Sequence, residues 1–272
     1  MGTAYLRKDS AATRPSPAFL VIVAVTVLCG LIAWRYGTIT DQPARVAVCG
    51  FVVAGWVLSL CLHEFGHAYL AFRSGDKSVA TRGYLTLNPA KYADPILSFG
   101  IPVLFILLGG IGLPGGAVWI DRGAIAGRIR HSLVAAAGPL SNVLFAIMLA
   151  VIFKNFADKE HGVFWAGLAF LAFLQVTAAF LNLLPIPGLD GFGILEPYLP
   201  RPLVERANEY GGYLFFGLIA CLWLIPPLNE AFFDVAFGLA HLLGLEEFPF
   251  DMLRDGVSPI RMGHALFRFW EE

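Results

Sequence analysis

The most constraining feature of this sequence is a long apolar stretch that ends in three polar side chains. Val46 to Val57 contains no charged residue, and the run continues as "SLCLHEFGHAYLAF". His63, Glu64 and His67 lie within this continuation. A charged side chain costs about 2.5 to 3.5 kcal/mol at the centre of a bilayer on insertion scales. We therefore expect a specific interaction to hold these three side chains in place.

Apolar runs recur along the chain, which is 57% hydrophobic and 14% charged, with a mean hydropathy of +0.69. Globular proteins contain about 25% charged residues, and a helix needs about 20 apolar residues to cross a bilayer. The sequence therefore predicts an all-α polytopic protein in a lipid bilayer, with about six transmembrane helices. The runs are Ala18 to Trp34, Val46 to Phe72, Leu133 to Phe153, Gly162 to Leu184, and Tyr213 to Ile225 with a continuation.

The remaining composition narrows the choice of partners. A net charge of -1 provides no strongly basic surface, so a nucleic-acid partner is not expected. The four cysteines stand singly inside apolar runs, without the paired spacing of a disulfide framework or a zinc ribbon. We interpret these cysteines as packing residues.

Both ends of the chain leave alternatives open. Arg7, Lys8 and Arg14 precede the first apolar run as they would in a signal peptide. The run is long for a signal peptide, and Arg35 stands where the small residues of a cleavage site belong, so a retained anchor is favoured. Near the other end, Gly212 to Leu245 is either one span followed by an interfacial helix or a hairpin of two spans.

Prolines and glycines break a further apolar run between Pro95 and Ile120. A re-entrant segment of two half-passes that meet at a glycine turn fits this pattern, provided that protein shields the turn from lipid. The glycines also match the nucleotide-binding pattern G-x-G-x-x-G, but no strand precedes them, which disfavours that alternative. Before this run, Ser78 to Leu87 is rich in β-branched and aromatic residues and predicts a short β-strand.

The two histidines are four residues apart, so on a helix their side chains share one face and can bind the same ion. His63, Glu64 and His67 form the pattern H-E-x-x-H, in which the histidines bind zinc and the glutamate acts as general base. Hydrogen-bonded histidines at the membrane surface are the alternative. Three titratable groups on one apolar span favour the metal site, because lipid would expel an unpaired set.

A catalytic zinc ion usually has three protein ligands, so a third ligand should lie elsewhere in the chain. Asp190 is a candidate, because it follows an apolar run within "NLLPIPGLDG", where Pro185 and Pro187 stop the helix. A solvated aspartate at a helix end is the alternative. The stretch "AAAGPLSN", from Ala135 to Asn142, adds a further polar side chain, although taken alone it is more typical of helix packing through small residues.

Together, "HEFGH", "AGPLSN" and "NLLPIPGLDG" resemble the site-2 protease family of intramembrane zinc metalloproteases, over about Ser59 to Gly191. "LTLNPAKYADP" further resembles the short subgroup without a PDZ or CBS accessory domain, although Tyr92 stands where that subgroup often has a histidine. The resemblance implies one Zn2+ per chain and specific roles for six residues. The metal ligands would be His63, His67 and Asp190, and the catalytic base would be Glu64. Asn142 and Asn182 would line the substrate path or help polarise the reacting carbonyl.

The same resemblance implies a single integral membrane protease domain over residues 1–272. Its catalytic core would span about 46–195, between an anchor span at 1–45 and a C-terminal span and tail at 196–272. The substrates would be transmembrane proteins, cut within or next to their membrane segments in regulated intramembrane proteolysis. A membrane metal-binding protein or transporter and an inactive protease-like scaffold are the alternatives, and the sequence leaves the oligomeric state open.

The predicted ligands can meet only if the second and fourth apolar runs end on the same side of the membrane, so Pro95 to Ile120 cannot cross it fully. The distribution of Lys and Arg agrees, because cytoplasmic loops are enriched in these residues. With a cytoplasmic N-terminus, the remaining Lys and Arg up to Arg206 lie inside, and the outer loops hold Arg35, Arg45, Lys154 and Lys159. We therefore expect the site toward the cytoplasmic side of a prokaryotic cell membrane.

Overall fold

The computed structural model describes residues 14–36, 42–92, 118–247 and 258–267, and these contain helices and no β-strand. Within these residues, four helices are long and apolar enough to cross a membrane: α2 (Pro17–Arg35), α3 (Gln42–Ser74), α7 (Arg128–Phe156) and α8 (Gly162–Asn182). A fifth span results if α10 (Arg201–Leu224) and α11 (Pro226–Leu242) are counted together. The all-α multi-pass architecture is therefore confirmed, whereas the expected count of about six spans is not.

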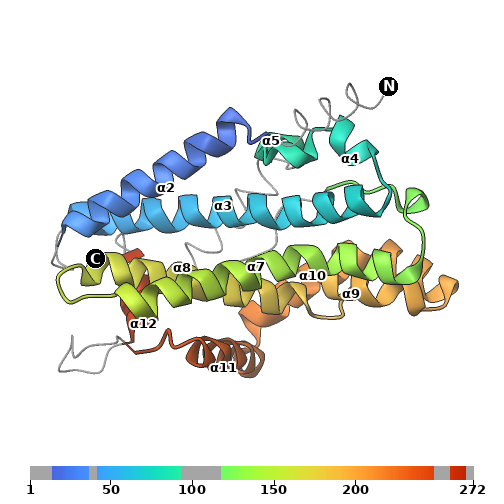
Figure 1. Cartoon of the computed structure of the whole chain (residues 1–272). Coiled ribbons are helices and arrows are strands. Elements are labelled where there is room, and N and C mark those ends of the chain that lie inside the picture. The colour runs from blue at the N-terminus through green and yellow to red at the C-terminus, as the bar shows by residue number, and fades with distance from the viewer. Residues whose placement is uncertain (1–13, 37–41, 93–117, 248–257, 268–272) are drawn as a thin grey trace.

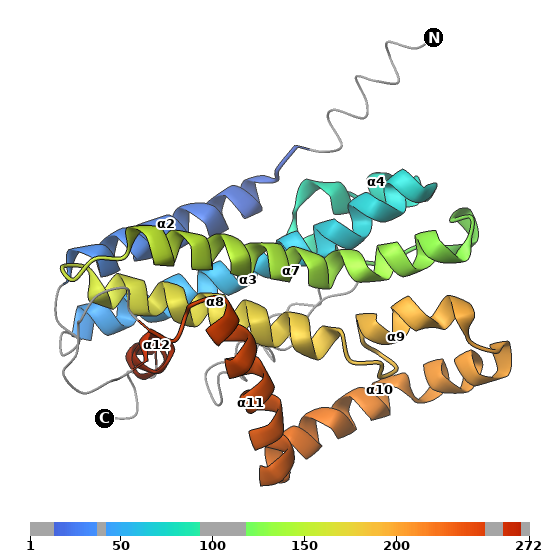
Figure 2. The ribbon, with the colours of Figure 1, turned by 60° about the horizontal axis from the view of Figure 1, so that its bottom comes forward.

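Helix α8 forms the centre of the bundle, with α3 and α7 packed along it (Figures 1 and 2). All of its residues are buried except Phe164 and Phe180, which explains why its sequence is apolar on every face. Helix α12 (Pro259–Phe267) crosses the first half of α8 closely. A Cβ at Gly263 would lie 2.1 Å from the Ala166 carbonyl oxygen, so this crossing requires glycine.

Helix α2 lies along α3 and exposes most of its side chains (Figure 1). Leu20, Leu28 and Leu31 are each more than half exposed, as expected for a helix that faces lipid. The helix begins at Pro17 because the Ser16 hydroxyl accepts the backbone N–H of Phe19 at 3.2 Å.

Helix α7 runs antiparallel to α3, because His67 contacts Val134 while His63 contacts Asn142. Helix α8 follows α7 after a short loop and returns in the direction of α3 (Figure 2). The second half of α3, the first half of α7 and the end of α8 therefore lie toward one end of the bundle, which we call the site end. The predicted re-entrant segment Pro95 to Ile120 lies outside the described residues except for its last three.

Two short 3-10 helices also lie at the site end. They are η3 (Arg122–Ala124), which precedes α7, and η4 (Glu196–Tyr198), which follows α9 (Asp190–Leu195). An ion pair between Arg122 and Glu196 joins them. Segments more than seventy residues apart in sequence are thus connected beside the start of α9.

The predicted β-strand at Ser78 to Leu87 is wrong. These residues form helix α4 (Ser78–Thr81) and the 3-10 helix η1 (Tyr84–Thr86), and α5 (Pro89–Tyr92) follows. The Asp76 carboxylate accepts the backbone N–H of Ser78 at 2.8 Å, which starts a helical turn rather than a strand. The β-branched and aromatic side chains fill a small core instead, made of Ala68, Ala71, Val79, Tyr84, Leu85, Ile125 and Val134.

The stretch from Gly212 to Leu245 is not a hairpin of antiparallel spans. Helices α10 and α11 are bent by 95° where they join (Figure 2). Pro226 and Pro227 lack the backbone N–H groups that would continue α10, so the helix breaks there. Helix α10 begins at Arg201, well before the predicted start at Tyr213. The prediction missed the first turns because they are polar, and a search for apolar runs does not find them.

Candidate metal centre

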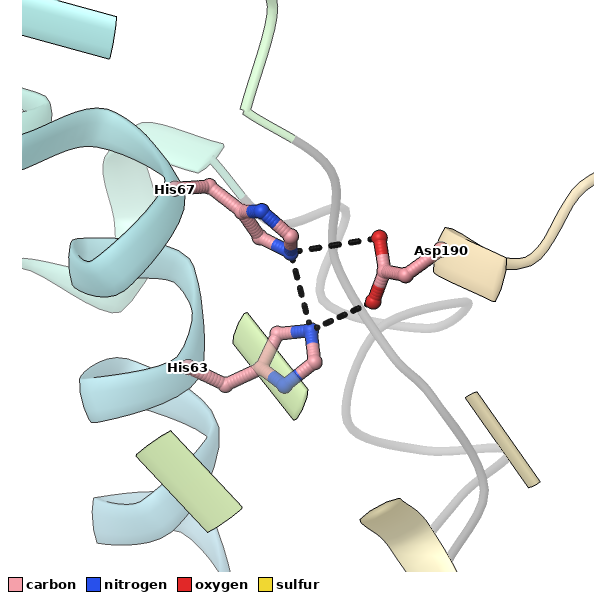
Figure 3. A group of neighbouring side chains, drawn as sticks. All are labelled: His63, His67 and Asp190. Atoms are coloured by element: carbon pink, nitrogen blue, oxygen red, sulfur yellow. Dashed lines mark hydrogen bonds and ion pairs between the residues drawn. The ribbon is translucent and has the colours of Figure 1, made fainter. Parts of the chain in front are cut away.

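The three predicted metal ligands meet at the site end of the bundle (Figure 3). His63 and His67 project from α3, and Asp190 is the first residue of α9. The Nε2 atoms of the two histidines are 3.1 Å apart. Asp190 places Oδ2 3.2 Å from His63 Nε2 and Oδ1 3.3 Å from His67 Nε2. Residues more than a hundred positions apart therefore present their ligand atoms to one point.

These donors suit a zinc ion in both chemistry and spacing. Zinc prefers histidine nitrogen and carboxylate oxygen among its ligands, at about 2.0 to 2.2 Å. Tetrahedral coordination at that length places neighbouring ligand atoms about 3.4 Å apart. The 3.1 Å between the two Nε2 atoms is close to this value, and each Nε2 has an Asp190 oxygen within 3.3 Å. With one ligand atom from each residue, the three atoms lie within 4.8 Å of one another.

Hydrogen bonds behind the site orient both histidine rings. His67 Nδ1–H donates to the Val134 carbonyl oxygen at 2.7 Å, and His63 Nδ1–H donates to Asn142 Oδ1 at 2.6 Å. Because both acceptors are oxygens, the proton of each ring resides on Nδ1 and the Nε2 lone pair is directed into the site. Both contacts come from α7, so this helix fixes the ligands that α3 carries.

Helix α7 approaches the histidines with bare backbone at Gly138. A Cβ at this position would lie 2.2 Å from His67 Nε2 and 2.5 Å from His63 Nε2. A real Cβ contact this short does not occur, so only glycine leaves room for both imidazoles. The "AGPLSN" stretch thus combines close helix packing with a direct contribution to the site, and sequence reasoning missed Gly138 as a site residue.

The two predicted asparagines lie in different surroundings. Asn142 is buried between His63 and α8, where its Nδ2 donates to Gln175 Oε1 at 2.9 Å. Its amide group is thus engaged on both sides, and a role toward substrate remains a prediction. Asn182, the last residue of α8, is buried and lines the cavity described below. Gln175 was not predicted, because one glutamine in an apolar helix carries no spacing signal.

We expect Asn142→Ala to weaken zinc binding by about 10- to 100-fold, because His63 loses the partner that fixes its ring. Gln175→Leu should act in the same direction with a smaller effect, since it removes only the support of Asn142. Competition with a metal chelator measures both affinities. Asn155→Ala is the matched control, because Asn155 lies exposed on the same helix and, within the described part of the chain, its side chain bonds only to the Val151 carbonyl. Unchanged zinc affinity in folded Asn142→Ala would contradict the expected role.

Glu64 lies on α3 beside the histidines and is almost fully buried. Its Oε2 accepts the backbone N–H of Val118 at 3.1 Å. Glu64 and the three ligands line one cavity of about 590 Å³. The segment Val118–Asp121 has no regular secondary structure, and its residues Val118, Trp119 and Ile120 also line the cavity.

The loop before Asp190 is shaped to return this residue toward α3. Pro185 and Pro187 prevent α8 from continuing, and the chain folds back on the end of the helix. A Cβ at Gly191 would lie 2.2 Å from the Leu183 carbonyl oxygen, so the turn is possible only with glycine. The proline and glycine positions of "NLLPIPGLDG" therefore place the carboxylate.

The sequence of this chain is similar to known proteins over most of its length. The chain is 46% identical over 257 residues, or 94% of its length, to "Putative zinc metalloprotease Rip2" of Mycolicibacterium smegmatis, and the match covers 95% of that protein. The protein of the same name from Mycobacterium tuberculosis matches to the same extent. The chain belongs to the site-2 protease family.

A third relative within this family is more distant. "Putative zinc metalloprotease YwhC" of Bacillus subtilis is 33% identical over 199 residues, which are 66% of this chain and 86% of that protein. The high coverage of these relatives fits the short subgroup that the sequence predicted. No family model and no solved structure matches the chain.

Proposed function

We propose that this chain is an intramembrane zinc metalloprotease that hydrolyses peptide bonds within or next to transmembrane segments of membrane proteins. The observation that carries the proposal is the meeting of His63, His67 and Asp190 with Glu64 in one cavity. The cavity lies at the end of a bundle of long apolar helices. The names of the relatives support zinc and proteolysis, and the donor set is suited to zinc.

Zinc on these ligands would supply an acidified water and a Lewis acid for the scissile carbonyl. Glu64 would accept the proton of the attacking water on its carboxylate and pass it to the leaving amine. The N–H of Val118 holds one oxygen of this carboxylate, which fixes its direction within the cavity. Asn182, on the cavity wall, would bind the substrate backbone.

A transmembrane substrate must unwind locally, because the amides of a helix are bonded internally. The segment Val118–Asp121 offers a place for the unwound stretch. It has no regular secondary structure, and among the described residues no hydrogen bond uses the peptide groups of Trp119 or Ile120. A substrate strand would pair with these groups beside Glu64. The predicted strand at Ser78 to Leu87 cannot serve in this way, because that stretch forms short helices.

We also propose that the N-terminus and the site end lie on the cytoplasmic side of a prokaryotic cell membrane. Arg128 and Arg130 begin α7 and Arg201 begins α10, and the start of α7 lies at the site end. Lys154 lies at the opposite end of α7. Cytoplasmic loops are enriched in such residues, which favours this orientation.

Metal removal and replacement test the proposal. The purified protein in detergent is incubated with a panel of single-span membrane proteins that carry a fluorophore at each end. We expect cleavage of at least one of them to stop on chelation and to return with zinc. Cleavage that persists in the metal-free protein would refute a zinc mechanism. A zinc-loaded protein that cleaves none of the panel would favour an inactive protease-like scaffold. If that protein also moves zinc into proteoliposomes, a metal transporter would be favoured instead.

A further inference from the structure

Asp76 is a buried carboxylate that the proposed mechanism does not use. It follows α3 by two residues and is 1% exposed. Among the described residues it takes part in no ion pair, and both of its carboxylate oxygens accept hydrogen bonds. Oδ1 accepts the backbone N–H of Ser78 and Oδ2 accepts that of Asp121, both at 2.8 Å. Burial of a charge is costly without such bonds, so this arrangement needs a reason.

The second of these hydrogen bonds joins the turn after the "HEFGH" helix to the segment Val118–Asp121 of the cavity wall. Asp121 ends the segment whose other end, Val118, donates its N–H to Glu64. The segment is therefore held by a carboxylate at each end. Glu64 lines the cavity, whereas Asp76, two residues after the end of α3, does not.

Two further contacts show that this junction is built closely. A Cβ at Gly75, whose φ is 129°, would lie 2.5 Å from the Ala124 carbonyl oxygen, so the turn before Asp76 packs directly on η3. Arg82 lies over the ring of Trp119, 4.2 Å from its centroid. The segment Val118–Asp121 and the η3 helix after it thus pack on the region that follows α3. Asp76 supplies the buried hydrogen bond of this contact, to the N–H of Asp121.

We propose that Asp76 is a positioning residue for the catalytic base. By fixing the N–H of Asp121, it sets the path of the segment Val118–Asp121 and thereby the N–H of Val118 that orients Glu64. This inference rests on the proposed protease function. A general base must lie within hydrogen-bond reach of its proton, and a displacement of about 1 Å lowers a rate by about 100-fold.

The test compares Asp76→Ala and Asp76→Asn with the parent. We expect kcat per zinc-loaded molecule to fall by about 10- to 100-fold in Asp76→Ala, with KM within about threefold and zinc affinity unchanged. Asp76→Asn should be intermediate, because an amide keeps one acceptor oxygen. Hydrogen exchange of the peptide covering residues 118–124 should accelerate by about 10-fold in Asp76→Ala, independently of activity.

Asp234→Asn is the matched control, since it removes a carboxylate that is exposed on α11. Parent-like kcat and exchange in Asp76→Ala would overturn the inference, and so would a loss of activity that merely follows a loss of zinc. Failure of the proposed function looks different, because then the parent itself cleaves no membrane substrate or Glu64→Gln cleaves as well as the parent.

Discussion

Glu64→Gln is expected to lower kcat for peptide cleavage by about 100- to 10,000-fold while zinc stays bound. The amide has nearly the size of the carboxylate, and its oxygen can still accept the N–H of Val118. It cannot take up a proton from water, so the proton-transfer step loses its base. The substitution alters none of the three proposed metal ligands, because Glu64 is not one of the clustered donors.

Two measurements on one preparation check this expectation: the rate of cleavage of a transmembrane substrate and the zinc content per chain. Glu160→Gln is the matched control, because Glu160 is an exposed glutamate in the loop between α7 and α8. A Glu64→Gln protein that cleaves at the parent rate would end the mechanism. One that loses zinc together with activity would assign Glu64 to the ligand set instead.

The metal cluster could be predicted from sequence because each part of it follows a local rule. The spacing of His63 and His67 places both on one helical face, wherever the helix lies. Asp190 was found through the prolines and glycine that end α8 and turn the chain back. The structure brings the three together within 4.8 Å. Only the choice among the acidic residues of the chain required the resemblance to a family.

The supporting contacts could not be predicted, because they depend on how helices pack. Gln175 meets Asn142 across the α7–α8 interface, and Val118 meets Glu64 from a separate segment. No local pattern links these positions. The prediction of a strand at Ser78 to Leu87 was wrong for a related reason. The β-branched and aromatic residues there reflect burial in a small core and not pairing in a sheet.

Gly138→Ala is expected to reduce zinc affinity by about 100-fold or more. The new Cβ would lie 2.2 Å from His67 Nε2 and 2.5 Å from His63 Nε2, so the parent positions of these atoms are no longer accessible. The helix can escape the overlap only by moving away from α3. That movement would stretch the hydrogen bonds from His67 to Val134 and from His63 to Asn142, which are made by the same helix.

This movement of α7 would itself disturb the metal site, so relaxation of the bundle does not restore zinc affinity. Chelator competition gives the affinity, and size exclusion in detergent shows whether the variant remains folded. Gly217→Ala is the matched control, because a Cβ at this α10 position meets no heavy atom within 4 Å. A folded Gly138→Ala protein with the zinc affinity of the parent would mean that the two imidazoles do not share a metal ion at this place, and the proposed catalytic centre would have to be abandoned.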